Sequence, residues 1–296
     1  MRLLTKGRTN PTPLMVYLGL ALGVSAVSSA AVLIRLADAP ALSIAAYRLV
    51  LASIFVVPIG LATDWDKLRA LTVKQWGLAA VSAACLAAHF AFWITSLEHT
   101  SVASSVIIVT ANPILVAIGS RFILRERSSP AVMMGIGMAL FGGLVITVGD
   151  WDLGDRRLYG DFLAFLGAAA VAGYYIAGRS LRENLSLFGY IAPVYSGGAI
   201  ILLVVIFVTD TAMTGFSVKT YSYLAFIGLV PQLVGHSSLN WSLGYLPATL
   251  VSTAVMAEPI GATLLAWAVL DETPPVATVV GGALVLIGVY TALRKR

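Results

Sequence analysis

Charged residues are scarce in this 296-residue sequence: 11% of positions are Asp, Glu, Lys or Arg, and 59% are hydrophobic. Ordinary globular domains carry roughly 25% charged residues. So few charges do not cover a water-exposed surface, which excludes a soluble globular protein. The apolar residues do not form the many short alternating strands of a membrane β-barrel. The composition therefore predicts an all-α polytopic membrane protein.

The sequence has a single cysteine and none of the usual catalytic motifs. Cys85 is the one cysteine, so an intrachain disulfide is excluded and no metal-ligand spacing exists. The sequence lacks HExxH, Gly-x-Ser-x-Gly and a P-loop. We therefore expect no catalytic residues, no bound metal and no cofactor, and the chain is predicted not to be an enzyme or an ATP-driven pump.

What the sequence does have is a series of apolar runs of about 20 residues, the length that crosses a hydrocarbon core. The first run follows basic residues but is longer than the apolar part of a signal peptide, so we expect a retained span. Short polar loops separate the runs, which gives ten predicted transmembrane helices. They lie at residues 13–35, 42–62, 75–96, 101–122, 131–149, 159–180, 187–208, 220–242, 247–269 and 275–293.

The basic residues predict the orientation, because cytoplasmic loops carry an excess of Lys and Arg. With the N-terminus inside, fourteen of the 19 Lys and Arg fall in inside segments and four in outside segments. Both termini are therefore predicted to be cytoplasmic. The basic residues are scattered and form no stripe with interleaved aromatics, so no nucleic-acid partner is expected.

An internal repeat appears when the chain is shifted by 146 residues. A proline, a glutamate and two glycines recur: Pro113, Glu126, Gly135 and Gly142 fall on Pro259, Glu272, Gly281 and Gly288. The repeat predicts two units, residues 1–150 and 151–296, of five helices each. Because five is odd, the second unit enters the membrane in the opposite orientation. Inverted repeats with substrate at their interface are typical of secondary transporters.

These repeated residues, together with "YRLVLA" at 47–52, resemble the paired signatures of EamA-type exporters in the drug/metabolite transporter (DMT) superfamily. The more specific resemblance is to the YddG-like amino-acid and metabolite exporters. The segments after Glu126 and Glu272 lack the usual Thr-x-x-Gln helix start. The resemblance implies a ten-helix, multi-pass exporter of the cell inner (plasma) membrane that works by alternating access as a monomer.

Polar and aromatic residues inside the predicted helices are the candidate substrate-binding groups. His89 and Trp93 are four residues apart and share a helix face, as do His236 and Asn240. The alternative is that such groups bond across helix interfaces, which is common in bilayers. The full predicted set is His89, Trp93, Asn112, His236, Asn240, Tyr174 and Ser25. Tyr174 and Tyr175 cannot both face inward, and Ser25 lies on a small-residue face that suits packing as well as a pore lining.

Asn112–Pro113 and Glu258–Pro259 occupy matching positions in the two units. A proline leaves a carbonyl one turn earlier unpaired, and a polar neighbour can repair this. Pro113 and Pro259 are therefore predicted hinges in kinked helices. Glu258 is either structural or a proton-coupling group, since an ionisable residue in a membrane span is a functional candidate. Arg48 lies at a similar depth and is a candidate partner for it.

The sequence thus predicts a secondary transporter that exports small metabolites, above all amino acids including aromatic ones. The alternatives within this fold are a multidrug or cation carrier and a nucleotide-type metabolite carrier; a membrane-embedded enzyme or channel is the alternative outside it. The expected partners are a small-molecule substrate and the lipid bilayer, with proton coupling left open.

Overall fold

A computed structural model describes residues 11–100, 102–148, 155–270 and 276–294. Within these ranges every regular element is helical, and eight helices are long and apolar enough to cross a membrane. The chain is therefore an all-helical polytopic membrane protein, as the composition predicts. Glu272 and the basic residues at both ends of the chain (Arg2, Lys6, Arg8, Lys295 and Arg296) lie outside the described residues.

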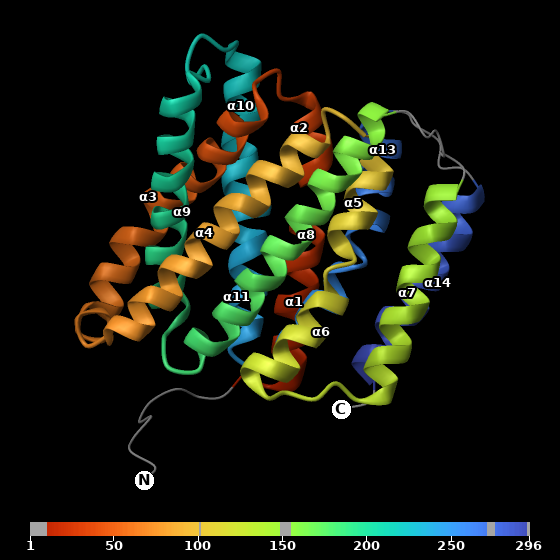
Figure 1. The fold of residues 1–296 in the computed structure, drawn as a ribbon, viewed down its shortest axis with the longest axis horizontal. Coiled ribbons are helices and arrows are strands. Elements are labelled where there is room, and N and C mark those ends of the chain that lie inside the picture. The colour runs from red at the N-terminus through yellow and green to blue at the C-terminus, as the bar shows by residue number, and fades with distance from the viewer. Residues whose placement is uncertain (1–10, 101, 149–154, 271–275, 295–296) are drawn as a thin grey trace.

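The helices pack side by side in one elongated bundle (Figure 1). The first half contains α1 (Pro13–Val27), α2 (Ala30–Leu36), α3 (Ala41–Arg69), α4 (Val73–Ser96), α5 (Val102–Thr110), α6 (Pro113–Gly119), the π-helix η1 (Ser120–Leu124) and α7 (Pro130–Val148). The second half contains α8 (Asp155–Arg182), α9 (Leu187–Thr209), α10 (Val218–Ile227), the π-helix η2 (Gly228–His236), α11 (Ser237–Leu243), α12 (Ala248–Val255), α13 (Glu258–Leu270) and α14 (Val276–Arg294).

The predicted spans 13–35, 101–122, 220–242 and 247–269 are each divided into shorter segments. Of these, 220–242 is the most altered, because α10, η2 and α11 follow one another without a gap and the nine residues of η2 are π-helical. Predicted span 131–149 corresponds to the apolar stretch Pro130–Ile146, which is shorter than the eight helices that are long enough to cross a membrane. A π-helix is rare and often marks a functional site.

The helix breaks predicted at the two prolines are present. α5 ends at Thr110 and α6 begins at Pro113, and likewise α12 ends at Val255 and α13 begins at Glu258. At the first break the Nδ2 of Asn112 donates a hydrogen bond to the carbonyl of Val109, at 2.9 Å. Val109 is the residue four positions before Pro113, so the side chain satisfies the carbonyl that proline leaves unpaired.

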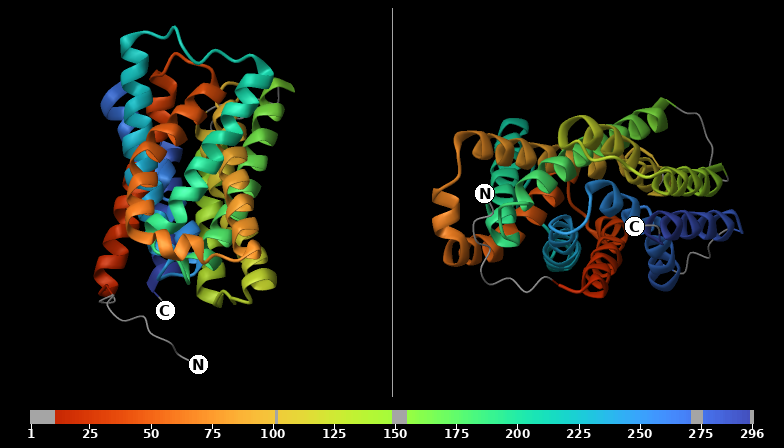
Figure 2. Two further views of the ribbon diagram at one scale, coloured as in Figure 1. Left: turned by 90° about the vertical axis from the view of Figure 1, so that its left-hand side faces the viewer. Right: turned by 90° about the horizontal axis from the view of Figure 1, so that it is seen from below.

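The two halves of the chain interlock rather than sitting apart. α3 packs along α9, and α4 packs along both α8 and α9. The start of α1 and the end of α14 lie at the same end of the bundle, the lower end in Figure 1, and Figure 2 shows the same arrangement from two further sides.

α7 and α14 form a close antiparallel pair at one edge of the bundle. A Cβ atom added to Gly135 would lie 2.5 Å from the carbonyl oxygen of Gly288, and one added to Gly142 would lie 2.5 Å from that of Gly281. Small residues let membrane helices approach this closely. The contacts are reciprocal, because an added Cβ at Gly288 would meet the carbonyl oxygen of Gly135 and one at Gly281 would meet that of Gly142. The 146-residue shift relates these same four glycines, Gly135 to Gly281 and Gly142 to Gly288.

Candidate functional site

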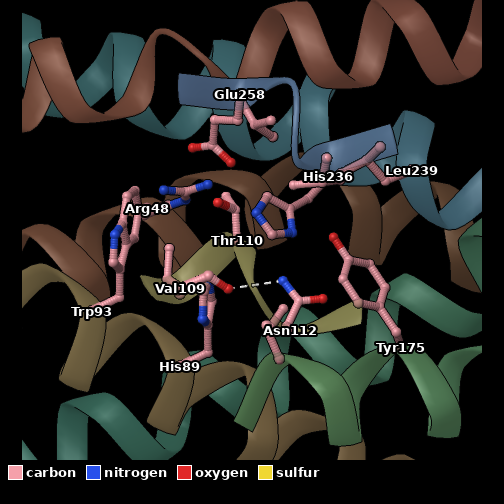
Figure 3. Close-up of a pocket in the computed structure, with 13 residues that line it drawn as sticks. Arg48, His89, Trp93, Val109, Thr110, Asn112, Tyr175, His236, Leu239 and Glu258 are labelled. Atoms are coloured by element: carbon pink, nitrogen blue, oxygen red, sulfur yellow. Dashed lines mark hydrogen bonds between the residues drawn. The ribbon is translucent and has the colours of Figure 1, made fainter. Parts of the chain in front are cut away.

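A small cavity lies in the middle of the bundle, where both halves of the chain meet (Figure 3). Its volume is about 30 Å³, enough for one or two water molecules. It is lined by Val27, Arg48, His89, Trp93, Val109, Thr110, Asn112, Val171, Tyr175, His236, Leu239, Val255 and Glu258. The structure thus brings six of the residues singled out from the sequence to one place: Arg48, His89, Trp93, Asn112, His236 and Glu258.

The lining contains pairs of residues that the 146-residue shift relates. Val109 and Val255 both line the cavity, as do the pairs Asn112 with Glu258 and Trp93 with Leu239. Each pair contributes one residue from each half of the chain. The cavity is therefore built from corresponding positions of the two sequence repeats.

Arg48 is a buried cation on the cavity wall, with only 1% of its surface exposed. Its Nε donates a hydrogen bond to the Oε1 of Gln232 at 2.8 Å, and its guanidinium lies 4.1 Å from the centre of the Phe90 ring. A cation over an aromatic face is attracted to the ring quadrupole. These two contacts fix the guanidinium, while its Nη1 has no hydrogen-bond partner among the described residues.

Glu258 is the acidic residue of the cavity and begins α13. Its side chain and that of Arg48 point toward one another (Figure 3). Among the hydrogen bonds and ion pairs of the described residues, however, none joins the two groups or involves the Glu258 carboxylate. The pairing considered from the sequence is thus a facing arrangement across the cavity and not a direct salt bridge.

The aromatic part of the wall is built around His89. Its Nδ1 donates to the carbonyl of Gly167 at 3.0 Å, because a carbonyl oxygen can only accept. Its ring stacks on Trp93, with centroids 5.8 Å apart and planes 4° from parallel. The ring of His236 lies 6.4 Å from that of His89, so the helix faces of the two predicted pairs, His89–Trp93 and His236–Asn240, meet at the histidines.

Several polar atoms of this wall are buried without a hydrogen-bond partner in the described part of the chain. They are Arg48 Nη1, Trp93 Nε1, Asn112 Oδ1 and His236 Nδ1. Buried polar groups are nearly always paired, and each exception calls for an explanation. Because all four residues line the same cavity, their unused hydrogen-bonding capacity fits a polar occupant.

Three predicted substrate-binding residues do not line the cavity: Asn240, Tyr174 and Ser25. The cavity-facing stripe of η2 and α11 runs through His236 and Leu239, so Asn240 turns toward α8 and α9. There its Nδ2 donates to the hydroxyls of Tyr174 and, at 3.2 Å, Tyr195. In this structure both Asn240 and Tyr174 therefore bond to a neighbouring helix, which is the arrangement named as the alternative.

The neighbouring Tyr175 is the tyrosine that reaches the cavity, since one residue step turns a helix by about 100°. Ser25 is exposed on the outside of α1. The buried face of that helix instead carries Leu20, Gly23, Ala26 and Val27, and of these Val27 reaches the cavity.

Contacts join the two halves of the chain at both ends of the bundle. At the lower end in Figure 1, where α8 and η1 end, the last turn of α8 carries Arg179. Its Nε binds Glu126 Oε1 at 2.8 Å and its Nη1 donates to the Leu243 carbonyl at 3.1 Å. At the upper end, Ser43 donates to the Ala212 carbonyl at 2.6 Å and Tyr47 to that of Met213 at 2.8 Å. The structure is thus a compact state with a central cavity.

Sequence reasoning missed Gln232, which holds Arg48 in place. Its signal was present: an amide in an apolar run, next to Pro231. A buried amide in a membrane span calls for a partner, and Arg48 is the charged residue that lies farthest from the ends of the predicted helices in the first half.

Comparisons with known proteins identify the family of this chain. The EamA-like transporter family profile matches it twice, at residues 14–148 and 158–294. "Uncharacterized transporter YyaM" of Bacillus subtilis is 28% identical over 68% of this chain and 68% of its own. The "Riboflavin transporter" of Brucella anthropi is 26% identical over 66% and 67%. The "Probable terminal-alkyne amino-acid exporter" of Streptantibioticus cattleyicolor is 24% identical over 67% and 66%.

One solved crystal structure superposes on 95% of this chain and 97% of its own, with a TM-score of 0.79 and 18% sequence identity. At that identity the likeness is to the fold alone. The fold of this chain is thus found in a solved protein across nearly the whole length of both.

Proposed function

The chain belongs to the EamA-like transporter family of the DMT superfamily, and from this premise we propose that it exports amino acids by alternating access. The broader statement, that it is a membrane transporter for small molecules, follows from the family and from relatives named as transporters. The choice of amino acids is our own step, and it rests on the cavity.

The observation that carries the proposal is the composition of that cavity. One cation, one anion, an aromatic wall and an apolar wall surround the same small space. A metabolite with a polar head and an apolar side chain matches these surfaces, because sites place a few polar groups among mostly apolar ones. The name of one relative, an amino-acid exporter, is in line with this choice.

We further propose ten membrane helices in two inverted units, residues 1–150 and 151–296, with both termini cytoplasmic. The double family match at 14–148 and 158–294 supports two units. The antiparallel glycine contacts between α7 and α14 support their opposite orientation. The excess of Lys and Arg in the segments assigned to the cytoplasm supports the placement of the termini.

Transport requires this cavity to widen, since about 30 Å³ is too small for an amino acid. The helix breaks before Pro113 and at Glu258–Pro259 lie at the cavity and are the proposed hinges. Opening one end would break the contacts of Arg179, and opening the other would break those of Ser43 and Tyr47. Alternating access is then the alternation of these two openings.

The second candidate is a carrier of larger aromatic metabolites, favoured by the relative named a riboflavin transporter and by the stacked His89–Trp93 wall. A flat ring system would stack on that wall without needing both charged groups. This candidate and amino-acid export make different demands on the substrate, so one panel of substrates separates them.

The test is transport by the purified protein in liposomes, with labelled L-phenylalanine, L-leucine and riboflavin, each with and without a pH gradient. We expect saturable exchange of the amino acids and none of riboflavin. Exchange of riboflavin alone would replace the proposal by the second candidate. Flux without saturation would indicate a channel, and a chemically altered product would indicate an enzyme.

A further inference from the structure

We infer that Arg48 and Glu258 bind the two opposite charges of a zwitterionic substrate: the guanidinium of Arg48 binds its carboxylate and the carboxylate of Glu258 binds its ammonium group. This inference rests on the proposed function and assigns its substrate recognition to two residues. It is carried by the placement of both groups on one cavity and by the hydrogen-bonding capacity that they leave unused.

The Arg48 guanidinium is positioned for recognition rather than neutralised. Gln232 and Phe90 hold it by one hydrogen bond and one ring face, and neither carries a negative charge. Nη1 stays without a partner within the described protein. Arginine binds carboxylates through two parallel N–H groups, so a guanidinium held this way presents a site for a carboxylate.

Glu258 provides the matching negative end from the other half of the chain. It is buried, with 7% of its surface exposed, and lies at the break between α12 and α13. Its carboxylate faces Arg48 across the cavity (Figure 3). Because no direct ion pair closes the gap, a molecule between the two groups can contact both.

Burial makes this arrangement selective for zwitterions. Charges in a low-dielectric site are costly unless they are paired. An amino acid pairs both charges at once, whereas a ligand with a single charge leaves either Arg48 or Glu258 unpaired. The same argument disfavours simple cations and simple anions, including amino acids whose carboxylate or ammonium group is blocked.

The rest of the cavity sets the class of side chain. Five aliphatic residues, Val27, Val109, Val171, Leu239 and Val255, line it together with the Trp93 ring. These surfaces accept apolar or aromatic groups and offer no charge to a third ionic group. The predicted substrates are therefore zwitterionic α-amino acids with apolar or aromatic side chains.

The experiment uses competition in liposomes that exchange labelled L-phenylalanine. The competitors are unlabelled L-phenylalanine, its methyl ester, which keeps only the ammonium group, and N-acetyl-L-phenylalanine, which keeps only the carboxylate. With the wild-type protein we expect both derivatives to compete at least tenfold more weakly than phenylalanine, since each leaves one buried charge unpaired.

Two substitutions then give a crossed pattern. Arg48→Gln should bring phenylalanine and its methyl ester to similar potency while N-acetyl-phenylalanine stays weak. Glu258→Gln should do the reverse and bring phenylalanine and N-acetyl-phenylalanine together. Arg48→Lys and Glu258→Asp keep the charges and should keep discrimination against both derivatives, which also covers the case in which a neutral variant does not fold.

Equal discrimination in wild type and both neutral variants would overturn the inference, and so would a uniform loss of potency for all three compounds. The latter would mean that the two residues stabilise the bundle, with water between them. These failures differ from a failure of the proposed function, in which wild-type liposomes exchange none of the labelled amino acids tested.

Discussion

Trp93 is the residue whose two roles at the cavity are the easiest to separate. Its ring stacks on His89, while its indole Nε1 is buried without a partner among the described residues. The ring explains packing, and the N–H group is available to a substrate. A substitution that keeps the ring and removes the N–H therefore distinguishes a wall residue from a binding residue.

We predict that Trp93→Phe raises the KM for the transported amino acid severalfold. The thermal stability should change little, because the lost N–H had no partner and an aromatic ring is kept; loss of a single hydrogen bond to substrate corresponds to about 0.5–1.5 kcal/mol. The measurements are exchange kinetics in liposomes and thermal unfolding in detergent. An unchanged KM would leave Trp93 with a packing role only.

Asn112 and Glu258 hold matching positions but use them differently. Asn112 repairs the Val109 carbonyl before Pro113, whereas a charged carboxylate at 258 cannot donate to the corresponding Val255 carbonyl. We predict that Asn112→Ala lowers the free energy of unfolding by about 1 kcal/mol, and that Glu258→Gln keeps or raises stability. Thermal unfolding of both variants beside wild type tests this; a Glu258→Gln protein less stable than Asn112→Ala would contradict it.

Glu258→Gln also decides whether Glu258 couples transport to protons. If it does, the variant still exchanges amino acid downhill, with the weaker binding expected from loss of the Glu258 charge, while accumulation driven by a pH gradient is lost. The comparison is made in the same liposomes with and without the gradient. Gradient-driven accumulation equal to wild type would assign Glu258 to structure and substrate binding alone.

At the scale of single residues the sequence predicted the cavity only in part. Polar and aromatic groups inside predicted helices pointed to His89, Trp93, Asn112, His236 and Glu258, because polar groups are costly in a membrane. The sequence did not decide between Tyr174 and Tyr175, since helix rotation depends on neighbours. It also favoured Asn240 over Leu239 as a cavity residue, because polarity alone does not show whether a polar side chain faces the cavity or a neighbouring helix.

At the scale of elements, the α7–α14 pair gives the sharpest test of packing. We predict that Gly135→Ala destabilises the protein by about 1–3 kcal/mol, the usual cost of overpacking, because its Cβ would meet the Gly288 carbonyl oxygen at 2.5 Å. Gly137 is the matched control on the same helix, with nothing within 4 Å of an added Cβ.

Gly137→Ala should be neutral or slightly stabilising, since alanine is the better helix former. Thermal unfolding of the two variants in the same detergent gives the comparison. Equal effects of the two substitutions would mean that the α7–α14 contact does not limit stability.

Hydropathy located the helices well because span length follows from bilayer thickness, and the prolines located both helix breaks. It did not reveal that Gly228–His236 is π-helical, because hydropathy does not report which carbonyl an N–H group binds. That local change matters, since it sets the directions in which Gln232 and His236 point. The hydrogen-bond register of a span is thus the part of the fold that required the structure.

At the scale of the whole molecule, the proposed opposite orientation of the two units makes a prediction about sidedness. A fluorescent protein fused after Arg296 should fluoresce, and alkaline phosphatase inserted in the segment that joins the two units, residues 149–154, should be active, since that enzyme folds in the oxidising space outside the inner membrane. Phosphatase activity at the C-terminus would reverse the proposed topology.

The proposed opening at the end of the bundle where Arg179 lies should become easier when Glu126, the partner of Arg179, is made neutral. The ion pair with Glu126 is partly exposed, so it contributes about 0–1 kcal/mol, and 1 kcal/mol changes an equilibrium about fivefold. In a Cys85→Ala background carrying Leu239→Cys, we predict that Glu126→Gln speeds alkylation of the cavity cysteine from the side on which Arg179 lies. If the variant is alkylated no faster than the Cys85→Ala, Leu239→Cys protein that keeps Glu126, the Arg179–Glu126 ion pair does not control opening at this end.

The reciprocal glycine contacts between α7 and α14 have a consequence in genetic terms. The group that an added Cβ at Gly135 meets first is the backbone carbonyl of Gly288, and Gly142 meets that of Gly281. A backbone oxygen is the same in every residue, and glycine already has the smallest side chain. A damaging substitution at either position therefore has no suppressor at the facing glycine, and revertants of Gly135→Ala should restore glycine itself or change residues that let the two helices move apart.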